Sequence, residues 1–176
     1  MKTVIQQMTA PVLREHAKPV KIEEIKSKKI QTILDKMRHA LNKEEDGVAI
    51  AAPQIGESLR IFIISGRTIS IINDIEDIDK NTLFPDQVFI NPVIKKLSKT
   101  KKKVEEGCLS VRWLYGQVAR STKATIEAYD EFGKKFQRGG SGLMAQIFQH
   151  EVDHLNGILF IDKAENVESI PPKKDA

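Results

Sequence analysis

The feature that most constrains this chain is QHEVDHLNG, residues 149–157, in which two histidines stand four apart and a glutamate directly follows the first. The segment before it is apolar over most of a helical circumference, which is typical of a helix buried among other elements. Ser141 is a candidate N-cap and Gly157 a candidate stop residue, so we expect a helix over about residues 141–156. The rest of the chain must therefore supply surfaces that cover this helix.

The polar groups on this buried helix require partners. Residues four apart on a helix point the same way, so His150 and His154 can bind one divalent metal ion. Glu151 projects about 100° away from His150, where it reaches a water on the metal without being a ligand. Two imidazoles and a carboxyl group are costly to bury unpaired, and a metal would satisfy them. On this motif alone, the solvent-exposed face of an ordinary helix without a metal stays an open alternative to a metal site.

A third ligand is needed, because catalytic metal sites typically have three protein ligands and one open position. No third histidine follows at a useful spacing, and the one cysteine of the chain, Cys108, is the soft ligand that remains. A lone thiol can also be a nucleophile or, as is usual for an isolated cysteine, inert core. A loop of small residues between Gly47 and Gly56 carries Gln54, and its composition lets a backbone or ligand come close.

The composition of the chain limits the classes of protein to which it can belong. The chain of 176 residues is 40% hydrophobic and 30% charged, which predicts one domain with a real core. Its apolar runs are too short to span a bilayer and its N-terminus lacks a signal-peptide pattern, so we expect a cytoplasmic protein with no membrane contact. Much of the positive charge lies between Lys95 and Lys103, a run that is either a solvated turn or a weak contact with RNA.

The remaining pattern predicts the order of elements. Apolar residues at helical spacing predict a helix over residues 23–42, and an apolar run predicts a strand at 60–65. Residues 87–97 are expected to be extended, and residues 103–109 lead into the cysteine. A hairpin is expected over residues 124–137, and residues 66–85 are expected to form an irregular surface insertion. We expect a catalytic domain over residues 1–165 and a short, flexible C-terminal tail over 166–176.

Three motifs in one order resemble the peptide deformylase family. They are AAPQIG at residues 51–56, EGCLS at residues 106–110 and QHEVDHLNG at residues 149–157, and the opening PVLREHAKPV is also similar. The resemblance covers nearly the whole chain. It implies an α+β fold in which antiparallel β-sheets pack around a buried central helix carrying the HExxH motif.

The resemblance also implies an activity. The enzyme would be a metal-dependent hydrolase that removes the N-formyl group from the N-terminal methionine of newly synthesised polypeptides and releases formate. Cys108, His150 and His154 would hold one divalent metal, usually Fe²⁺, with Zn²⁺, Ni²⁺ or Co²⁺ also accepted. Water activated by the metal would attack the formyl carbon, with Glu151 as general base and then general acid.

Further roles follow by motif. The side-chain amide of Gln54 and the backbone N–H of Leu109 would stabilise the negative charge that develops on the formyl oxygen. Gly47 and Ala49 would line a strand edge beside the substrate peptide, and Gln146 would face the pocket for the methionine side chain.

Neighbouring charged residues and departures from the family pattern complete the expectations. Glu106 and Arg120 are expected to pair, while Asp153 either orients the helix or a histidine or is a surface acid. Ala49 replaces a usual glycine, Arg112 replaces a usual proline, and Gln146 places a polar group at the substrate pocket. Two alternatives therefore stay open: an amidase for another small N-acyl peptide, and a non-enzymatic module that binds ribosomes or nascent chains.

Overall fold

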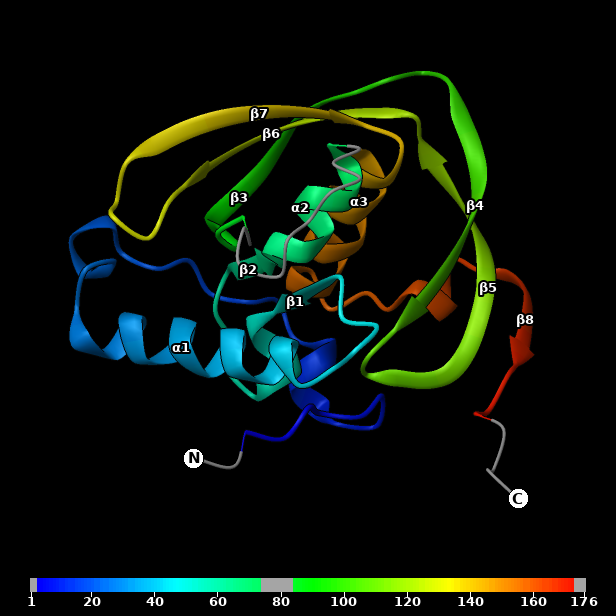
Figure 1. Ribbon diagram of the computed structural model, residues 1–176, viewed down its shortest axis with the longest axis horizontal. Coiled ribbons are helices and arrows are strands. Elements are labelled where there is room, and N and C mark those ends of the chain that lie inside the picture. The colour runs from blue at the N-terminus through cyan, green and yellow to red at the C-terminus, as the bar shows by residue number, and fades with distance from the viewer. Residues whose placement is uncertain (1–2, 74–83, 173–176) are drawn as a thin grey trace.

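The computed structural model describes residues 3–73 and 84–172, which form two antiparallel β-sheets and several helices (Figure 1). The expected α+β class is confirmed. The five-stranded sheet has the order β1 (Ala49–Ala51), β2 (Ile61–Ile64), β3 (Gln87–Leu97), β6 (Lys123–Tyr129) and β7 (Lys135–Ser141). The three-stranded sheet has the order β4 (Lys101–Cys108), β5 (Val111–Ser121) and β8 (Glu165–Ser169). The helices are α1 (Lys28–Asn42), α2 (Gly66–Ile72) and α3 (Leu143–Leu155), with short 3₁₀ turns η1 (Pro11–Arg14), η2 (Ile22–Glu24), η3 (Ala52–Ile55) and η4 (Phe160–Asp162).

Helix α3 carries both histidines of the HExxH motif and packs against strands of both sheets (Figure 1). Its buried side chains include Met144, Ile147 and Phe148, as the apolar pattern predicted. The expected cap at Ser141 is wrong, because Ser141 ends β7 and Gly142 occupies the N-cap with φ 54°. The reversal from strand to helix requires this left-handed conformation, which glycine adopts without strain.

The C-terminal stop of α3 agrees with the sequence. Gly157 has φ 74° and its N–H donates to the carbonyl of His154 at 3.1 Å. A Cβ atom at this position would lie 2.6 Å from the carbonyl oxygen of Arg14, so close packing as well as backbone conformation requires glycine.

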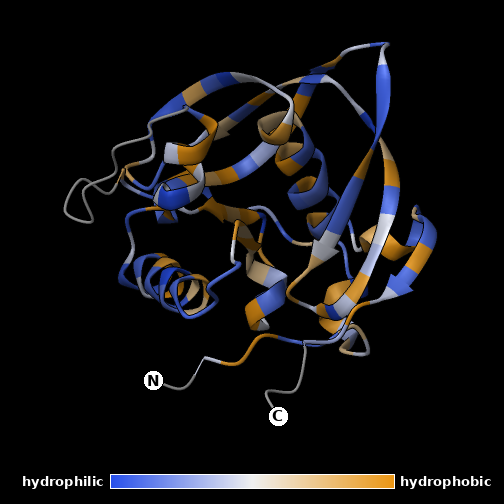
Figure 2. Ribbon diagram, turned by 45° about the vertical axis from the view of Figure 1, so that its right-hand side comes forward, coloured by the Kyte–Doolittle hydropathy of each residue, from blue (hydrophilic) through white to orange (hydrophobic). Residues whose placement is uncertain are grey.

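Helix α1 is amphipathic and starts later than expected. Its buried apolar residues pack with residues of β1, β2 and β3, while Lys28 and Lys29 are exposed. The ribbon of α1 accordingly carries both hydrophobic and hydrophilic colours in Figure 2. The predicted start at residue 23 is wrong, since η2 forms a separate turn and the hydroxyl of Ser27 caps α1 by accepting from the N–H of Ile30 at 3.3 Å. A serine cap satisfies an otherwise orphan N–H and fixes the helix boundary.

The expected irregular insertion is wrong for residues 66–72, which form α2. The hydroxyl of Ser65 caps this helix through the N–H of Thr68, and Ile69 and Ser70 are buried. Residues 74–83 of the expected insertion lie outside the described residues. The strand at β2 and the β6–β7 hairpin are confirmed, with β7 reaching further than expected, to Ser141.

The C-terminal boundary also differs from expectation. Residues 166–169, assigned to a flexible tail, belong to β8, which pairs with β5 through Leu114 opposite Ser169. Every residue of β8 is exposed, so no apolar pattern marked it as a strand. Within the described residues, no helix is long and apolar enough to cross a membrane.

The two sheets meet at a corner where the chain passes from β3 to β4 and from β5 to β6. The N–H of Ser98 donates to the carbonyl of Lys123 at 2.9 Å, and that of Thr122 to Thr100 at 3.0 Å. These bonds lock the two crossings together. Strands β1 and β4 each end their own sheet, and both line the cavity described below.

Candidate active site

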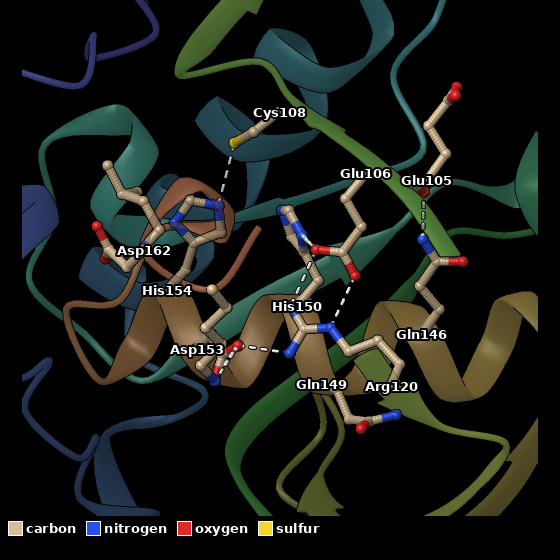
Figure 3. A network of polar contacts seen from close by, with 12 residues as sticks. Glu105, Glu106, Cys108, Arg120, Gln146, Gln149, His150, Asp153, His154 and Asp162 are labelled. Carbon is tan, nitrogen blue, oxygen red and sulfur yellow. Dashed lines mark hydrogen bonds and ion pairs between the residues drawn. The ribbon is translucent and has the colours of Figure 1, made fainter. Parts of the chain in front are cut away.

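The two motifs on β4 and α3 bring three ligand atoms together. Cys108 ends β4, while His150 and His154 lie one turn apart on α3. One sulfur and one nitrogen from each histidine lie within 4.8 Å of one another, and Cys108 Sγ is 3.2 Å from His154 Nε2 (Figure 3). The predicted Cys, His, His set is therefore assembled from segments more than forty residues apart.

Glu106 fixes the orientation of His150. Its Oε2 lies 2.9 Å from His150 Nδ1, which leaves the other ring nitrogen toward Cys108 (Figure 3). Burial alone would raise the pKa of Glu106, but hydrogen bonds from Arg120 and His150 outweigh it and lower the pKa to about 2. Burial would likewise lower the pKa of His150, yet contacts with Cys108 and Glu106 raise it well above 6.5. A carboxylate behind a histidine is the usual support of a metal ligand.

Cys108 is held as a thiolate. Burial would raise the pKa of this thiol, but the charge of His154 and hydrogen bonds from both histidines lower it to about 5. Thiolate is the form of cysteine that binds metals. Within the described residues, His154 Nδ1 and Glu151 Oε2 are buried side-chain atoms without a hydrogen-bond partner. The thiolate and the two imidazoles that converge here fit a divalent metal ion at this position.

Glu151 lies where a proton-transfer group is needed. It is 4% exposed, and its carboxyl group lines the same cavity as Cys108 and His150. Burial raises the pKa of Glu151, while the nearby histidine charges oppose the rise. A carboxyl group with a raised pKa and a free oxygen can accept and return a proton.

Gln54 faces the ligand cluster from the opposite wall. It lies in η3, which ends at Gly56 with φ 87°. Its Oε1 accepts from the N–H of Ala51 at 2.8 Å, and its Nε2 lies 3.5 Å from Cys108 Sγ. Leu109, directly after the cysteine, is buried and lines the cavity. The two expected oxyanion donors therefore both line the cavity beside Cys108.

A cavity of about 320 Å³ opens beside these groups. Val48 and Ala49 line it from the β1 side, Gly107 from β4, and Gln146 and Ile147 from α3. Its size suits a short peptide segment or a small ligand.

Gly47 has a different position from the one expected. It is not among the residues that line the cavity, and a Cβ there would lie 2.9 Å from both the side chain and the carbonyl of Leu41. Its small size therefore serves packing against α1. Ala49 lines the cavity but is only 9% exposed, and it also packs in the core with Phe62 and Met144.

Two residues that departed from the family pattern have defined contacts. Gln146 Nε2 donates to the carbonyl of Glu105 on β4 at 2.8 Å, so its amide ties α3 to the cavity wall (Figure 3). Arg112 donates to Asp46 at 2.8 Å and also to Glu44, which connects the β4–β5 turn to the loop before β1.

The expected pair of Glu106 and Arg120 is present, with Nε to Oε1 at 2.7 Å. Asp153 accepts from Arg120 at 2.6 Å and from Lys163 at 2.7 Å, so it anchors α3 to β5 and contacts no histidine directly. The alternative of a free surface acid is wrong, because this side chain is 13% exposed and doubly paired.

Sequence reasoning gave no role to two buried polar residues of the motifs. Gln149 accepts from the N–H of Ser121 and donates to its carbonyl, both at 3.0 Å, which joins α3 to the end of β5. Ser110 accepts from Gln54 Nε2 at 3.2 Å. Their presence inside the QHExxH and EGCLS motifs was the available signal, but the partners are distant in sequence.

Comparison with known proteins agrees with this geometry. The family model for polypeptide deformylase matches residues 2–169. The chain belongs to the polypeptide deformylase family. Among deformylases, it is 38% identical over 164 residues to the peptide deformylase of Desulforudis audaxviator, covering 93% of this chain and 94% of the relative. It is 40% identical over 151 residues to peptide deformylase 2 of Clostridium acetobutylicum, covering 86% and 87%.

Solved deformylase structures are similar as well. The Met-Ala-Ser-bound crystal structure of the class I type b deformylase from Acinetobacter baumannii matches with a TM-score of 0.78 and 32% identity, covering 93% of this chain and 99% of that one. The deformylase structure from Legionella pneumophila matches with a TM-score of 0.75 and 37% identity, covering 92% and 85%. This chain is accordingly a metal-dependent enzyme that removes N-formyl groups.

Proposed function

We propose that Cys108, His150 and His154 hold one Fe²⁺ ion and that the substrate is the formyl-methionyl end of a nascent polypeptide. The buried thiolate and two imidazoles support this ligand set, and Zn²⁺, Ni²⁺ or Co²⁺ suit the same donors. Bound there, the metal supplies Lewis-acid chemistry, which polarises a carbonyl group and lowers the pKa of a water molecule.

Glu151 carries the proton in the proposed reaction. Its carboxylate takes a proton from the attacking water, whose oxygen forms a bond to the formyl carbon. The carboxylic acid then returns that proton to the amide nitrogen as the carbon–nitrogen bond breaks, giving formate and a free amine. The buried, unpartnered Oε2 of Glu151 beside the ligand cluster is the observation that carries this proposal.

Gln54 and Leu109 act on the formyl oxygen. The side-chain Nε2 of Gln54 and the backbone N–H of Leu109 donate hydrogen bonds to this oxygen as negative charge develops on it. Donors that are fixed in advance lose no reorganisation energy in the transition state, and each is worth about 3 kcal/mol. The position of Gln54 Nε2, 3.5 Å from Cys108 Sγ, supports this role.

The substrate backbone lies as an added strand in the cavity. Strand β1 ends one sheet and β4 ends the other, and Ala49 and Gly107 from these edges both line the cavity. An extended peptide adds to such edges through main-chain hydrogen bonds that do not depend on sequence. This arrangement suits an enzyme whose substrates share only their first residue. The side chain of that first residue then lies toward Gln146 and Ile147.

The second candidate function is that of a related amidase acting on another small N-acyl peptide, and two residues of the cavity favour it. Gln146 places an amide on the cavity wall, and Ala49 adds a methyl group to the same cavity. A non-enzymatic module for ribosomes or nascent chains is not favoured, because binding alone gives no need for a buried, unpartnered carboxyl group beside three ligand atoms.

Two further proposals concern location and contacts. The substrate class places the enzyme where translation occurs, in the cytoplasm, and the catalytic domain extends at least through β8. The lysines from Lys95 to Lys103 lie at the corner between the sheets, and Lys96, Lys99 and Lys101 are exposed and, within the described residues, have no ion-pair partner. Such unpaired charge on a rigid corner supports a weak contact with RNA of the ribosome.

The test is formate release from formyl-Met-Ala-Ser under anaerobic conditions with Fe²⁺ supplied. Native chain, Glu151→Gln and the control Glu127→Gln are compared, together with acetylated and other formylated peptides. Release by the native chain and the control but not by Glu151→Gln is expected. Faster cleavage of another N-acyl peptide would replace the formyl-methionyl assignment with the amidase alternative, and equal release by Glu151→Gln would remove the proposed proton carrier.

A further inference from the structure

Ser110 occupies an unusual position in the turn between β4 and β5. It is completely buried, and its Oγ accepts a hydrogen bond from Gln54 Nε2 at 3.2 Å. Its backbone N–H points to Cys108 Sγ at 3.5 Å. One small residue therefore contacts both the cysteine ligand and the side-chain amide that faces it.

The contacts of Gln54 define which way its amide points. Its Oε1 accepts from the N–H of Ala51 at 2.8 Å. Rotating the amide by 180° would place the NH₂ group of Gln54 against the N–H of Ala51, and two donors cannot form a hydrogen bond. The Nε2 group has two N–H bonds, directed to Ser110 Oγ and to Cys108 Sγ. With the first N–H held by the serine, the direction of the second is set by the planar geometry of the amide.

We propose that Ser110 is a positioning residue that holds one N–H of the Gln54 amide, so that the second N–H, which lies toward Cys108 Sγ, is aimed at the ligand cluster where the formyl oxygen of the substrate binds. This inference rests on the proposed function of the same site. Glutamine has several rotatable bonds, and a donor contributes fully to transition-state stabilisation only when it is fixed before the charge develops. Ser110 supplies that fixation from outside the cavity wall without touching the substrate.

The expected kinetic effect is specific. Ser110→Ala leaves Gln54 present but free to rotate, so kcat falls about tenfold while KM changes less than about twofold, as for an interaction made mainly in the transition state. The matched control is Ser121→Ala, another buried serine of the β4–β5 hairpin, whose hydroxyl donates to the carbonyl of Ser98 at 3.0 Å, away from the cavity. This control keeps kcat within about twofold of native.

A double-mutant cycle separates positioning from a general structural effect. In a Gln54→Met background, which keeps the side-chain length but removes the amide, Ser110→Ala is expected to lower kcat by less than about twofold. An equal loss in both backgrounds would overturn the proposal, and so would an unchanged kcat for Ser110→Ala alone. Ser110→Gly repeats the comparison with different packing if the alanine variant does not fold.

A measurement that needs no turnover completes the test. In the zinc-loaded chain, the side-chain NH₂ resonances of Gln54 are assigned by their loss in Gln54→Met. Ser110→Ala is expected to shift or broaden them while metal content stays at the native level; unchanged resonances overturn the proposal. If the native chain releases no formate but the resonances still respond, the proposed function fails, and only the contact by which Ser110 orients the Gln54 amide stands.

Discussion

Arg120 grips Glu106 with two parallel hydrogen bonds, Nε to Oε1 at 2.7 Å and Nη2 to Oε2 at 2.9 Å. The same guanidinium reaches Asp153 on α3 through its remaining arm at 2.6 Å. Glu106 in turn contacts Nδ1 of His150. A single arginine on β5 therefore aligns β4, α3 and one metal ligand, and bidentate pairs of this kind are the strong form of ion pair.

The first prediction concerns the pH dependence of this network. The pKa of Glu106 is lowered from 4.5 to about 2 by Arg120 and His150 despite burial. The lowered pKa of Glu106 stabilises the folded state fully above pH 4.5, and this stabilisation is lost as the pH falls toward 2. At about 1.4 kcal/mol per pKa unit, it amounts to at most about 3 kcal/mol. We expect Glu106→Gln, stripped of metal by a chelator, to be less stable than the stripped native chain at neutral pH, with a difference that shrinks on acidification.

Urea unfolding at a series of pH values between 2 and 7 measures this difference. The matched control is Glu165→Gln, whose carboxylate pairs with Lys103 at an exposed site. Exposed pairs contribute little, so the control should track the native chain across the range. Coincident curves for Glu106→Gln and the native chain would show that the network does not stabilise the fold, and a constant offset would contradict the predicted pH dependence.

The second prediction is a trade-off at Glu151. Burial raises the pKa of this carboxyl group, and one of its oxygens has no partner in the described residues. A raised pKa means that stability is lost as the pH rises through it, so charged Glu151 destabilises the metal-free fold. The free energy of unfolding of metal-free Glu151→Gln, relative to that of the metal-free native chain, is expected to shift in favour of the variant from pH 4 to pH 8, while formate release falls at least about a hundredfold. A difference in stability that is the same at both pH values would contradict this.

The site was readable from sequence because its chemistry lies in short motifs. His150, Glu151 and His154 share one helix, and helical spacing alone places the two histidines side by side. Cys108 was identified as the remaining soft ligand, but the role of Gln54 required the family resemblance, since no local pattern reports that β4 and η3 meet at α3. The contact of Ser110 with Gln54 joins residues 56 apart and could not be read from either motif by itself.

The fold was less predictable where local signals were weak or short. Strand β8 is wholly exposed, so its existence depends on edge pairing with β5 and not on an apolar pattern. Helix α2 spans only seven residues, too few for a clear periodicity. The N-terminus of α3 was misplaced because a positive-φ glycine, Gly142, replaces the side-chain cap that Ser141 suggested.

The third prediction tests Gln146 as a determinant of substrate preference. Gln146→Leu removes an amide from the cavity wall and breaks its bond to the carbonyl of Glu105. An apolar wall favours the methionine side chain, so kcat/KM for a formyl-Met peptide should rise about three- to tenfold relative to a formyl-Ser peptide. Competition between the two peptides in one reaction measures the ratio directly. A constant ratio would assign Gln146 to structure alone.

The fourth prediction asks whether the methyl group of Ala49 narrows the cavity. Ala49 packs in the core beside Phe62, so Ala49→Gly should cost about 1 kcal/mol of stability through backbone freedom and lost packing. Because the side chain is only 9% exposed, we expect KM for formyl-Met-Ala-Ser to change less than about threefold. Thermal unfolding and steady-state kinetics on the same preparation check both parts. A tenfold fall in KM would instead mean that the methyl group obstructs the substrate.

The last prediction concerns the lysine corner. Lys96, Lys99 and Lys101 are exposed beside the hydrogen bonds that join the two sheets, so their charges are presented on a rigid support. Replacing all three with glutamate should weaken binding to ribosomes about tenfold or more and lower the slope of log affinity against log salt by about two to three. Formate release from a short peptide should stay unchanged, because the corner does not line the cavity.

The control carries the same charge change on α1 and the segment before it, at Lys26, Lys28 and Lys29, which are also exposed. Equal weakening by both variants would indicate only a response to net charge, and binding to anionic vesicles but not to ribosomes or RNA would redirect the contact to a membrane surface.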